Sequence, residues 1–254
     1  MYGSLVKLAD PLAEIVFYDA VQECLPSNLR ECDAYILTGS PASAYDNDEW
    51  IRNLKGFIRK ANEHKIGLIG ICFGHQIIAA ALGGKVAKSS KGWGIGVHSY
   101  VIQKVAEKYS FFTGGKMNVK AVASHQDQVV QLPKHAVRLA GTDFCPNGMY
   151  AVGNHIWTMQ THPEFSAKFA SDLYNMRKSR FQAQQLMYAL ATLESKMDAP
   201  MVSQWISNFV RAQVLEKRAA ARLQANAAIY RVMRSVCILS AFSLLMRKGF
   251  NLQI

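Results

Sequence analysis

Residues 66–82 of the 254-residue chain read IGLIGICFGHQIIAAAL. The first six are apolar on both faces, which is typical of a strand buried inside a parallel sheet. The last six form an apolar helical pattern that two glycines end. Cys72 lies where the strand would meet the helix, with Gly70 and Gly74 two residues to either side. The stretch therefore predicts a sharp strand–nucleophile–helix elbow, because small residues beside the nucleophile let the backbone turn.

This position would give the thiol of Cys72 the surroundings that a nucleophile needs. At a helix N-terminus, the helix dipole and the free N–H groups favour the thiolate form. The N–H of Phe73 would point to the place where an oxyanion develops. The pattern G-x-C-x-G taken alone also fits other thiol proteins with an elbow, and hydrolases whose usual nucleophile has been replaced.

A second motif, THPE at residues 161–164, follows a predicted strand over residues 156–160. In extended backbone, side chains two positions apart face the same side, so Glu164 can orient the His162 ring while His162 faces the thiol. A cysteine nucleophile needs such a base, itself held by a third group. His162 alone would equally fit an exposed loop histidine. The two motifs together predict the catalytic triad Cys72, His162 and Glu164.

The segments GICFGHQ (70–76) and HPE (162–164) resemble the two signature blocks of class I glutamine amidotransferases. The likeness runs from about residue 2 to 210, and within the family the chain resembles stand-alone GMP-synthase-like amidotransferases and plant γ-glutamyl peptidases. Further similar segments are TGSPASAYD (38–46), ALGGKV (81–86), KGWGIGVH (91–98) and SHQD (124–127). The resemblance implies a flavodoxin-like α/β fold of three αβα layers, with a mainly parallel sheet and a small antiparallel sheet.

The resemblance also implies a role for each matching residue. Cys72 would attack the γ-carboxamide carbon of the substrate. His162 would give a proton to the departing ammonia or amine, and would then activate the water that hydrolyses the thioester. The backbone N–H groups of Phe73 and Ser40 would form the oxyanion hole. The substrate would be glutamine or another γ-glutamyl compound, such as a glutathione derivative.

Three further residues match positions that contact the substrate. Gln76 would help to hold the α-amino-carboxylate group, and Ser124 and His125 would lie in the loop that closes over it. His125 equally fits a hydrogen bond that anchors this loop. The five cysteines have neither C-x-x-C pairing nor zinc spacing, and we expect no metal and no cofactor. The 254 residues leave no stretch for a synthase domain, and we expect any acceptor of ammonia to be a separate protein.

The N-terminus departs from the family pattern, because the chain begins almost inside a predicted helix over residues 3–9. The resemblance implies an earlier strand, paired centrally between the predicted strands 14–18 and 34–38. An empty gap there would leave backbone groups unpaired inside the sheet. We therefore expect that the neighbours close up, that another segment inserts, or that the chain is shortened. A catalytically weak binding protein that keeps the fold is the competing hypothesis for function.

The C-terminal part carries most of the charge. From residue 165 onward there are 13 Lys/Arg and 4 Asp/Glu, which leaves only +2 of the net charge of +11 to the first 164 residues. The basicity is thus separate from the predicted chemistry, and nucleic-acid binding is not expected. We predict an amidotransferase-like domain over 1–210 and a basic, apolar-ended helical tail over 211–254, whose helices would suit a homo-oligomer.

Two simple features bear on localisation. No apolar run approaches the roughly 20 residues of a membrane-spanning helix, and the start of the chain lacks the charged and apolar regions of a signal peptide. The sequence therefore predicts a cytoplasmic protein without a membrane span.

Overall fold

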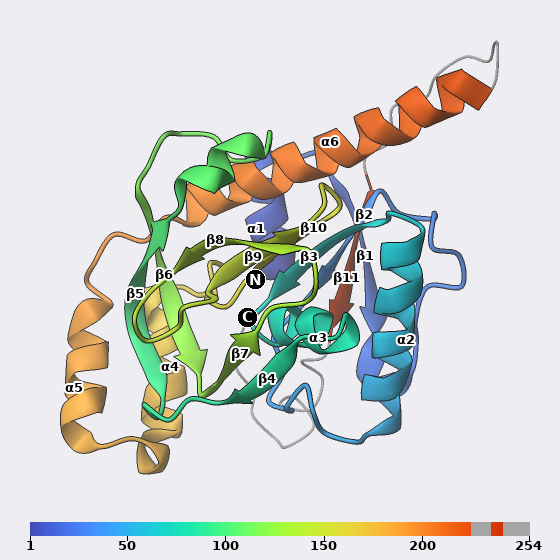
Figure 1. Ribbon diagram of the computed structural model, residues 1–254. Coiled ribbons are helices and arrows are strands. Elements are labelled where there is room, and N and C mark those ends of the chain that lie inside the picture. The colour runs from blue at the N-terminus through green and yellow to red at the C-terminus, as the bar shows by residue number, and fades with distance from the viewer. Residues whose placement is uncertain (225–234, 241–254) are drawn as a thin grey trace.

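The computed structural model of the chain describes residues 1–224 and 235–240. Helices cover both faces of one large sheet (Figure 1). The α-helices are α1 (Tyr2–Ala9), α2 (Glu49–Glu63), α3 (Phe73–Ala81), α4 (Ala167–Met176), α5 (Ala183–Thr192) and α6 (Ala199–Gln224). The short 3-10 helices are η1 (Ala20–Gln22), η2 (Lys104–Lys108) and η3 (Lys178–Arg180).

The strands alternate with helices in the first third of the chain and then follow one another directly. The first six are β1 (Glu14–Asp19), β2 (Ala34–Leu37), β3 (Gly67–Ile71), β4 (Lys85–Lys88), β5 (Gly94–Ile102) and β6 (Asn118–His125). The others are β7 (Asp127–Gln131), β8 (Ala136–Gly141), β9 (Met149–Val152), β10 (Ile156–Met159) and β11 (Ser235–Ser240). The predicted change from alternating elements to consecutive strands after residue 85 is confirmed.

The main sheet has nine strands in the order β1-β11-β2-β3-β10-β9-β8-β5-β6. Neighbours from β1 to β10 are parallel, and neighbours from β10 to β6 are antiparallel. The sheet is therefore mixed, and the prediction of a mainly parallel sheet with a separate antiparallel one was wrong in this respect. Most of the predicted antiparallel strands extend the main sheet, because β9 pairs with the last parallel strand. A separate small antiparallel sheet does exist and pairs β4 with β7.

The gap predicted between the strands at 14–18 and 34–38 is filled by β11. Ile15 of β1 lies opposite Val236, and Val236 also lies opposite Ala34 of β2. Of the three outcomes expected for this gap, the insertion of another segment is the one observed. The prediction that 211–254 is helical fails for residues 235–240, and residues 225–234 and 241–254 of the predicted tail lie outside the described residues.

The side chains of alternate residues in the central strands pack into two separate hydrophobic cores. Ala34 and Ile36 of β2 pack in a cluster with α1 and α6, in which Trp205 and Phe209 are buried. Tyr35 and Leu37 face the other way, toward a cluster formed with α2 and α3. This alternation follows from the pleat of a strand, and it produces the three layers that the resemblance implied.

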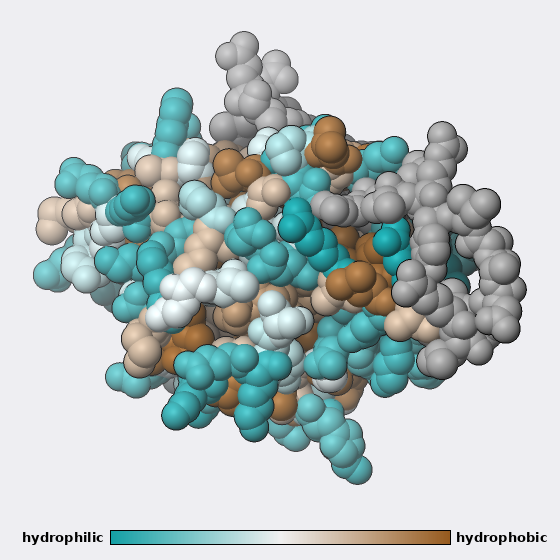
Figure 2. Space-filling view, turned by 90° about the horizontal axis from the view of Figure 1, so that it is seen from above, coloured by the Kyte–Doolittle hydropathy of each residue, from teal (hydrophilic) through white to brown (hydrophobic). Residues whose placement is uncertain are grey.

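The helix α6 is continuous across residue 210. Gln213 and Val214 are buried, and the Gln213 amide nitrogen donates to the backbone oxygen of Asn154 at 2.9 Å. Figure 2, a view from above in Figure 1, shows hydrophobic residues in separate groups among hydrophilic ones on this side. No helix in the described ranges is long and apolar enough to cross a membrane.

Candidate active site

Cys72 lies between β3 and α3 in a backbone conformation that few non-glycine residues adopt, with φ 54° and ψ −104°. Its N–H donates to the backbone oxygen of Met159 in β10 at 2.9 Å, which fixes the turn to the neighbouring strand. A Cβ atom at Gly74 would lie 2.0 Å from the Leu37 carbonyl oxygen, and one at Gly70 would lie 2.7 Å from the Gly74 carbonyl carbon. Only glycine fits these positions, so the predicted elbow is confirmed.

His162 and Glu164 follow the end of β10, beside the elbow. The Nδ1 atom of His162 lies 2.6 Å from Oε1 of Glu164, and both residues are buried. The His162 backbone N–H donates to the Val122 oxygen at 2.7 Å, while the ring stacks on Phe165 with centroids 4.1 Å apart. The imidazole therefore has little freedom to turn.

The charge state of His162 depends on its neighbours. Burial by itself lowers the pKa of His162, but the Cys72 sulfur and the Glu164 carboxylate outweigh burial and raise it to about 10. Both neighbours also hydrogen-bond to the ring. The three residues that the sequence predicts as a triad thus lie together, and their arrangement favours the imidazolium form of His162.

Two backbone N–H groups near Cys72 are available to an oxyanion. Phe73 is the first residue of α3, and the first N–H groups of a helix have no partner within it. Ser40 lies in the turn after β2, and this turn lines a small cavity together with Cys72 and His162. In the part of the chain that the structure describes, neither the Phe73 nor the Ser40 N–H has a hydrogen-bond partner. Both predicted donors are thus free in this structure.

Tyr2, which the sequence motifs do not include, approaches the site from α1. The N–H of Gly39 donates to the Tyr2 hydroxyl at 2.9 Å. Burial, followed by the Glu164 charge, raises the pKa of Tyr2 well above its ordinary value, so the hydroxyl stays protonated. Tyr2 fixes the turn that carries Ser40, and no motif in the first nine residues signals this contact.

The predicted substrate residues line a cavity that reaches Cys72. Its lining residues include Ser40, Ser43, Cys72, Gln76, Lys88, Trp93, Ser124, His125, Asp127, Arg177 and Arg180. The structure therefore brings together all three residues expected to contact the substrate, Gln76, Ser124 and His125. Trp93 lines the same cavity.

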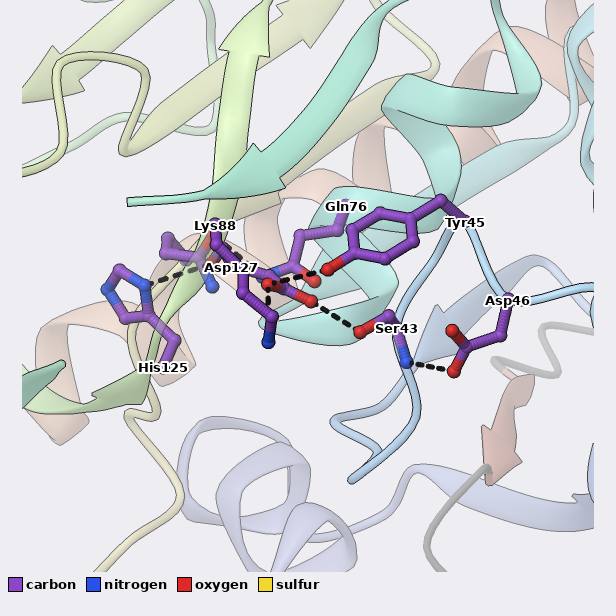
Figure 3. Close-up of polar contacts among 8 residues, drawn as sticks. Ser43, Tyr45, Asp46, Gln76, Lys88, His125 and Asp127 are labelled. Atoms are coloured by element: carbon purple, nitrogen blue, oxygen red, sulfur yellow. Dashed lines mark hydrogen bonds and ion pairs between the residues drawn. The ribbon is translucent and has the colours of Figure 1, made fainter. Parts of the chain in front are cut away.

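Gln76 and His125 both hold the loop after β6. The Gln76 amide nitrogen donates to the Asp127 backbone oxygen at 2.7 Å, and His125 Nδ1 lies 3.1 Å from the same oxygen (Figure 3). Burial, with a smaller effect of His98, lowers the pKa of His125 to about 3. A neutral His125 that donates to this carbonyl is a loop anchor, as one of the two predicted alternatives proposed.

Asp127 joins two loops on the rim of the cavity. Its carboxylate accepts hydrogen bonds from Ser43 Oγ at 2.6 Å and from the Tyr45 hydroxyl at 3.1 Å. It also lies 3.7 Å from the Lys88 amine (Figure 3). The residues quoted as TGSPASAYD and SHQD are thus linked through Asp127, a residue to which the sequence assigns no role of its own.

Arg177 and Arg180 bring positive charge to the cavity. Burial, together with repulsion from Arg180, lowers the pKa of Arg177, while Cys72 acts in the opposite direction. No carboxylate in the described residues lies within ion-pair distance of either guanidinium. In the sequence these two residues are only part of the C-terminal basicity, because the turn that brings them to Cys72 is a tertiary feature.

Comparison with known proteins gives consistent results. The family model described as glutamine amidotransferase class-I matches residues 8–175. The chain is 33% identical over 150 residues to γ-glutamyl peptidase 3 of Arabidopsis thaliana, covering 58% of this chain and 60% of that protein. It is 31% identical over 182 residues to a putative glutamine amidotransferase-like protein of Schizosaccharomyces pombe, covering 70% and 72%.

Solved structures show the same fold. The glutamine amidotransferase of Methylobacillus flagellatus superposes with a TM-score of 0.64 at 20% identity, covering 87% of this chain and 98% of that one. At this identity the likeness speaks for the fold alone. The chain spans only about 60% of the length of the γ-glutamyl peptidase that it matches.

Proposed function

Because this chain belongs to the class I glutamine amidotransferase family, we propose that it hydrolyses a γ-glutamyl amide through a thioester on Cys72. One observation carries the proposal. Cys72 occupies a strained turn at the start of α3, beside a buried imidazole that Glu164 holds at 2.6 Å. A thiol in this position has its base, its orienting carboxylate and an anion-stabilising helix N-terminus at once.

The proposed reaction has two balanced halves. The Cys72 thiolate attacks the γ-carbonyl carbon, and the N–H groups of Phe73 and Ser40 stabilise the negative oxygen that forms. The intermediate collapses as imidazolium His162 gives its proton to the leaving ammonia or amine. Neutral His162 then takes a proton from water, which attacks the thioester. Glutamate leaves, and the thiolate and the imidazolium are restored.

The direct test measures ammonia release from glutamine and, in parallel, release of cysteinyl-glycine from glutathione. We expect at least one of these activities in the wild-type protein and neither in Cys72→Ala. Equal background for both proteins on both substrates would overturn the proposal, and would favour the alternative of a binding protein that keeps the fold. If glutamine is the substrate, the ammonia would pass to a separate synthase.

The charge of Glu164 should set the alkaline limit of activity. His162 must be protonated to serve the leaving group, and its pKa of about 10 preserves the proton through neutral pH. In Glu164→Gln one of the influences that raise this pKa is absent. We expect the alkaline limb of kcat/KM to move down by about 1 to 2 pH units, and kcat to fall by at least about 100-fold.

The measurement is a pH–rate profile of the variant beside the wild type. Asp172→Asn serves as the matched control, because this carboxylate is exposed and paired with Lys168 at 2.8 Å. It should leave both limbs in place. An alkaline limb that does not move in Glu164→Gln would contradict the assigned link between Glu164 and His162.

A second candidate, γ-glutamyl peptidase activity, is favoured by Arg177 and Arg180. Glutamine carries a single carboxylate, whereas a γ-glutamyl peptide carries another one on its leaving group. Two guanidiniums without an ion-pair partner among the described residues give the cavity more positive charge than one carboxylate needs. The matched relative from Arabidopsis thaliana is itself named a γ-glutamyl peptidase.

The leaving group can be tested with a pair of substrates. For Arg180→Gln we expect KM for γ-glutamyl-glycine to rise about tenfold, with little change for the uncharged γ-glutamyl-methylamide. Lys178→Gln, in the same 3-10 helix but outside the lining of the cavity, is the control. Equal effects of Arg180→Gln on both substrates would argue against a site for the charged leaving group.

A further inference from the structure

The side chain of Gln160 lies against the proposed nucleophile. Gln160 directly follows β10, two residues before His162, and it is fully buried. Its amide nitrogen Nε2 is 3.7 Å from the Cys72 Sγ atom. Its backbone N–H donates to the Gly148 oxygen at 2.8 Å, which fixes the residue to the chain beside β9. These contacts fix the amide group of Gln160 beside the sulfur atom of Cys72.

The orientation of the Gln160 amide follows from a backbone carbonyl. The Asp127 oxygen can only accept a hydrogen bond, so the group that Gln76 presents to it at 2.7 Å must be Nε2. The same Nε2 lies 3.1 Å from the amide of Gln160, which must therefore present its oxygen Oε1. The Gln160 nitrogen is then left to face Cys72. The Asp127 backbone oxygen thus fixes the orientation of the Gln76 amide, and the Gln76 amide in turn fixes the orientation of the Gln160 amide beside the sulfur.

We propose that Gln160 is a further catalytic residue, which donates a hydrogen bond to the Cys72 thiolate. This inference rests on the proposed function, in which that thiolate attacks the substrate. A donor aimed at a negative charge is about twice as strong as one between neutral groups, and burial strengthens it further because water does not compete. The bond favours the states in which the sulfur is charged.

The sulfur is charged at two points of the cycle. It is a thiolate before the attack, and it becomes a thiolate again when the tetrahedral intermediate of thioester hydrolysis collapses. In the thioester itself the sulfur is neutral, so the hydrogen bond from Gln160 is weakest there. Gln160 therefore stabilises the resting nucleophile and also the leaving group of the second half-reaction.

Gln76 keeps Gln160 in this orientation. Its Nε2 holds both the Asp127 loop and the Gln160 oxygen, and the side chain lines the substrate cavity. Without this contact the Gln160 amide could turn its oxygen toward the thiolate, which would repel it. Gln76 is accordingly a positioning residue for the nucleophile, besides its proposed contact with the substrate.

The test follows alkylation of Cys72 by iodoacetamide, read from the Cys72 peptide by mass spectrometry. Because only the thiolate reacts, we expect Gln160→Met to react about tenfold more slowly than wild type on the acidic limb of the pH–rate curve, where the thiolate is the minor form. The two rates should become equal at alkaline pH, where the thiol is fully ionised. The other titratable groups that act on this sulfur are unchanged in the variant: His162, Arg177, Tyr2, Tyr100 and Cys145.

Two further variants make the result decisive. Gln213→Met removes a buried amide donor in α6 that bonds to Asn154, and it should alkylate like wild type. Gln76→Met keeps Gln160 but removes the hydrogen bond that fixes the orientation of its amide, and it should slow alkylation on the same acidic limb by a smaller factor. It also provides an answer if Gln160→Met does not fold.

The outcomes separate the inference from the function on which it rests. Slower alkylation in both the Gln160 and Gln76 variants, with Gln213→Met unaffected, supports the inference. Wild-type rates in a folded Gln160→Met, or in Gln76→Met where that protein does not fold, would overturn it. Failure of the proposed function has a different signature, in which wild-type Cys72 reacts no faster at pH 7 than a free cysteine.

Discussion

A Cys72→Ala protein is expected to hydrolyse the γ-glutamyl substrate at least about 10⁴-fold more slowly than wild type. The reason is that every step of the proposed reaction passes through the sulfur. Neither His162 nor the oxyanion donors can form the thioester by themselves, and a water molecule would have to attack the amide directly. The loss should appear in kcat, because the cavity residues that bind the substrate are unchanged.

The fold should tolerate this substitution. Alanine keeps the Cβ atom and removes one buried atom from a residue that is 6% exposed. The strained φ of 54° remains, so thermal unfolding should change little. Cys24→Ala, at an exposed free thiol, is the control and should keep full activity.

The intermediate provides a second readout. Wild-type protein quenched in acid during turnover should carry a glutamyl group on the Cys72 peptide, detectable by mass spectrometry, and Cys72→Ala should carry none. Substantial turnover by Cys72→Ala, or a glutamyl adduct on another residue, would disprove the assignment of the nucleophile.

The largest effect on stability is expected at β11. The substitution Ile238→Pro removes an N–H from a strand that is paired on both sides, with β1 and with β2. Proline in a central strand loses a ladder hydrogen bond and fixes φ, and we expect a cost of about 3 kcal/mol or more in the free energy of unfolding. Urea unfolding followed by circular dichroism measures it.

The matched control is Ile238→Val, which keeps the N–H and should unfold near the wild-type urea concentration. A chain that ends at Gln224 should be affected still more, because among the described strands β11 is the one that pairs with β1. If this shortened chain unfolded at the wild-type urea concentration, β11 would make no contribution to the stability of the sheet.

The parts of the fold that the sequence predicted are those encoded by neighbouring residues. The elbow at 70–74 combines a buried strand, a nucleophile and two glycines within a few positions, and the glycine contacts explain why this pattern is so restrictive. The pair His162 and Glu164 is likewise local, since two positions in extended backbone bring their side chains to one side. These features needed no knowledge of the tertiary structure.

The strand β11 shows what local patterns leave open. The apolar run SVCILS fits a buried strand or a helix equally well by periodicity, and the helix-forming residues before it favoured a helix. Its partners, β1 and β2, lie about two hundred positions earlier in the chain. Tertiary pairing decided the outcome against the local propensity.

The contacts made by Gln160 and Tyr2 were unpredictable for a related reason. Gln160 is separated from Cys72 by 88 positions, and Tyr2 is separated from Gly39 by 37. Each contact depends on how two elements that are distant in the sequence pack against each other. A single glutamine or tyrosine in a sequence does not indicate such packing, whereas the spaced residues of a motif do.

The central place of β11 also has a consequence for the order of events during synthesis. The strand that separates β1 from β2 is translated after every other strand of the sheet. At a synthesis rate of roughly 5 to 20 residues per second, many seconds pass between the synthesis of β2 and the synthesis of β11, the strand that pairs between β1 and β2. The turn with Ser40 directly follows β2, so the strand that leads into this turn gains its partner β11 only after that moment. A nascent chain would thus contain the elbow at Cys72 long before the sheet beside the Ser40 turn is complete.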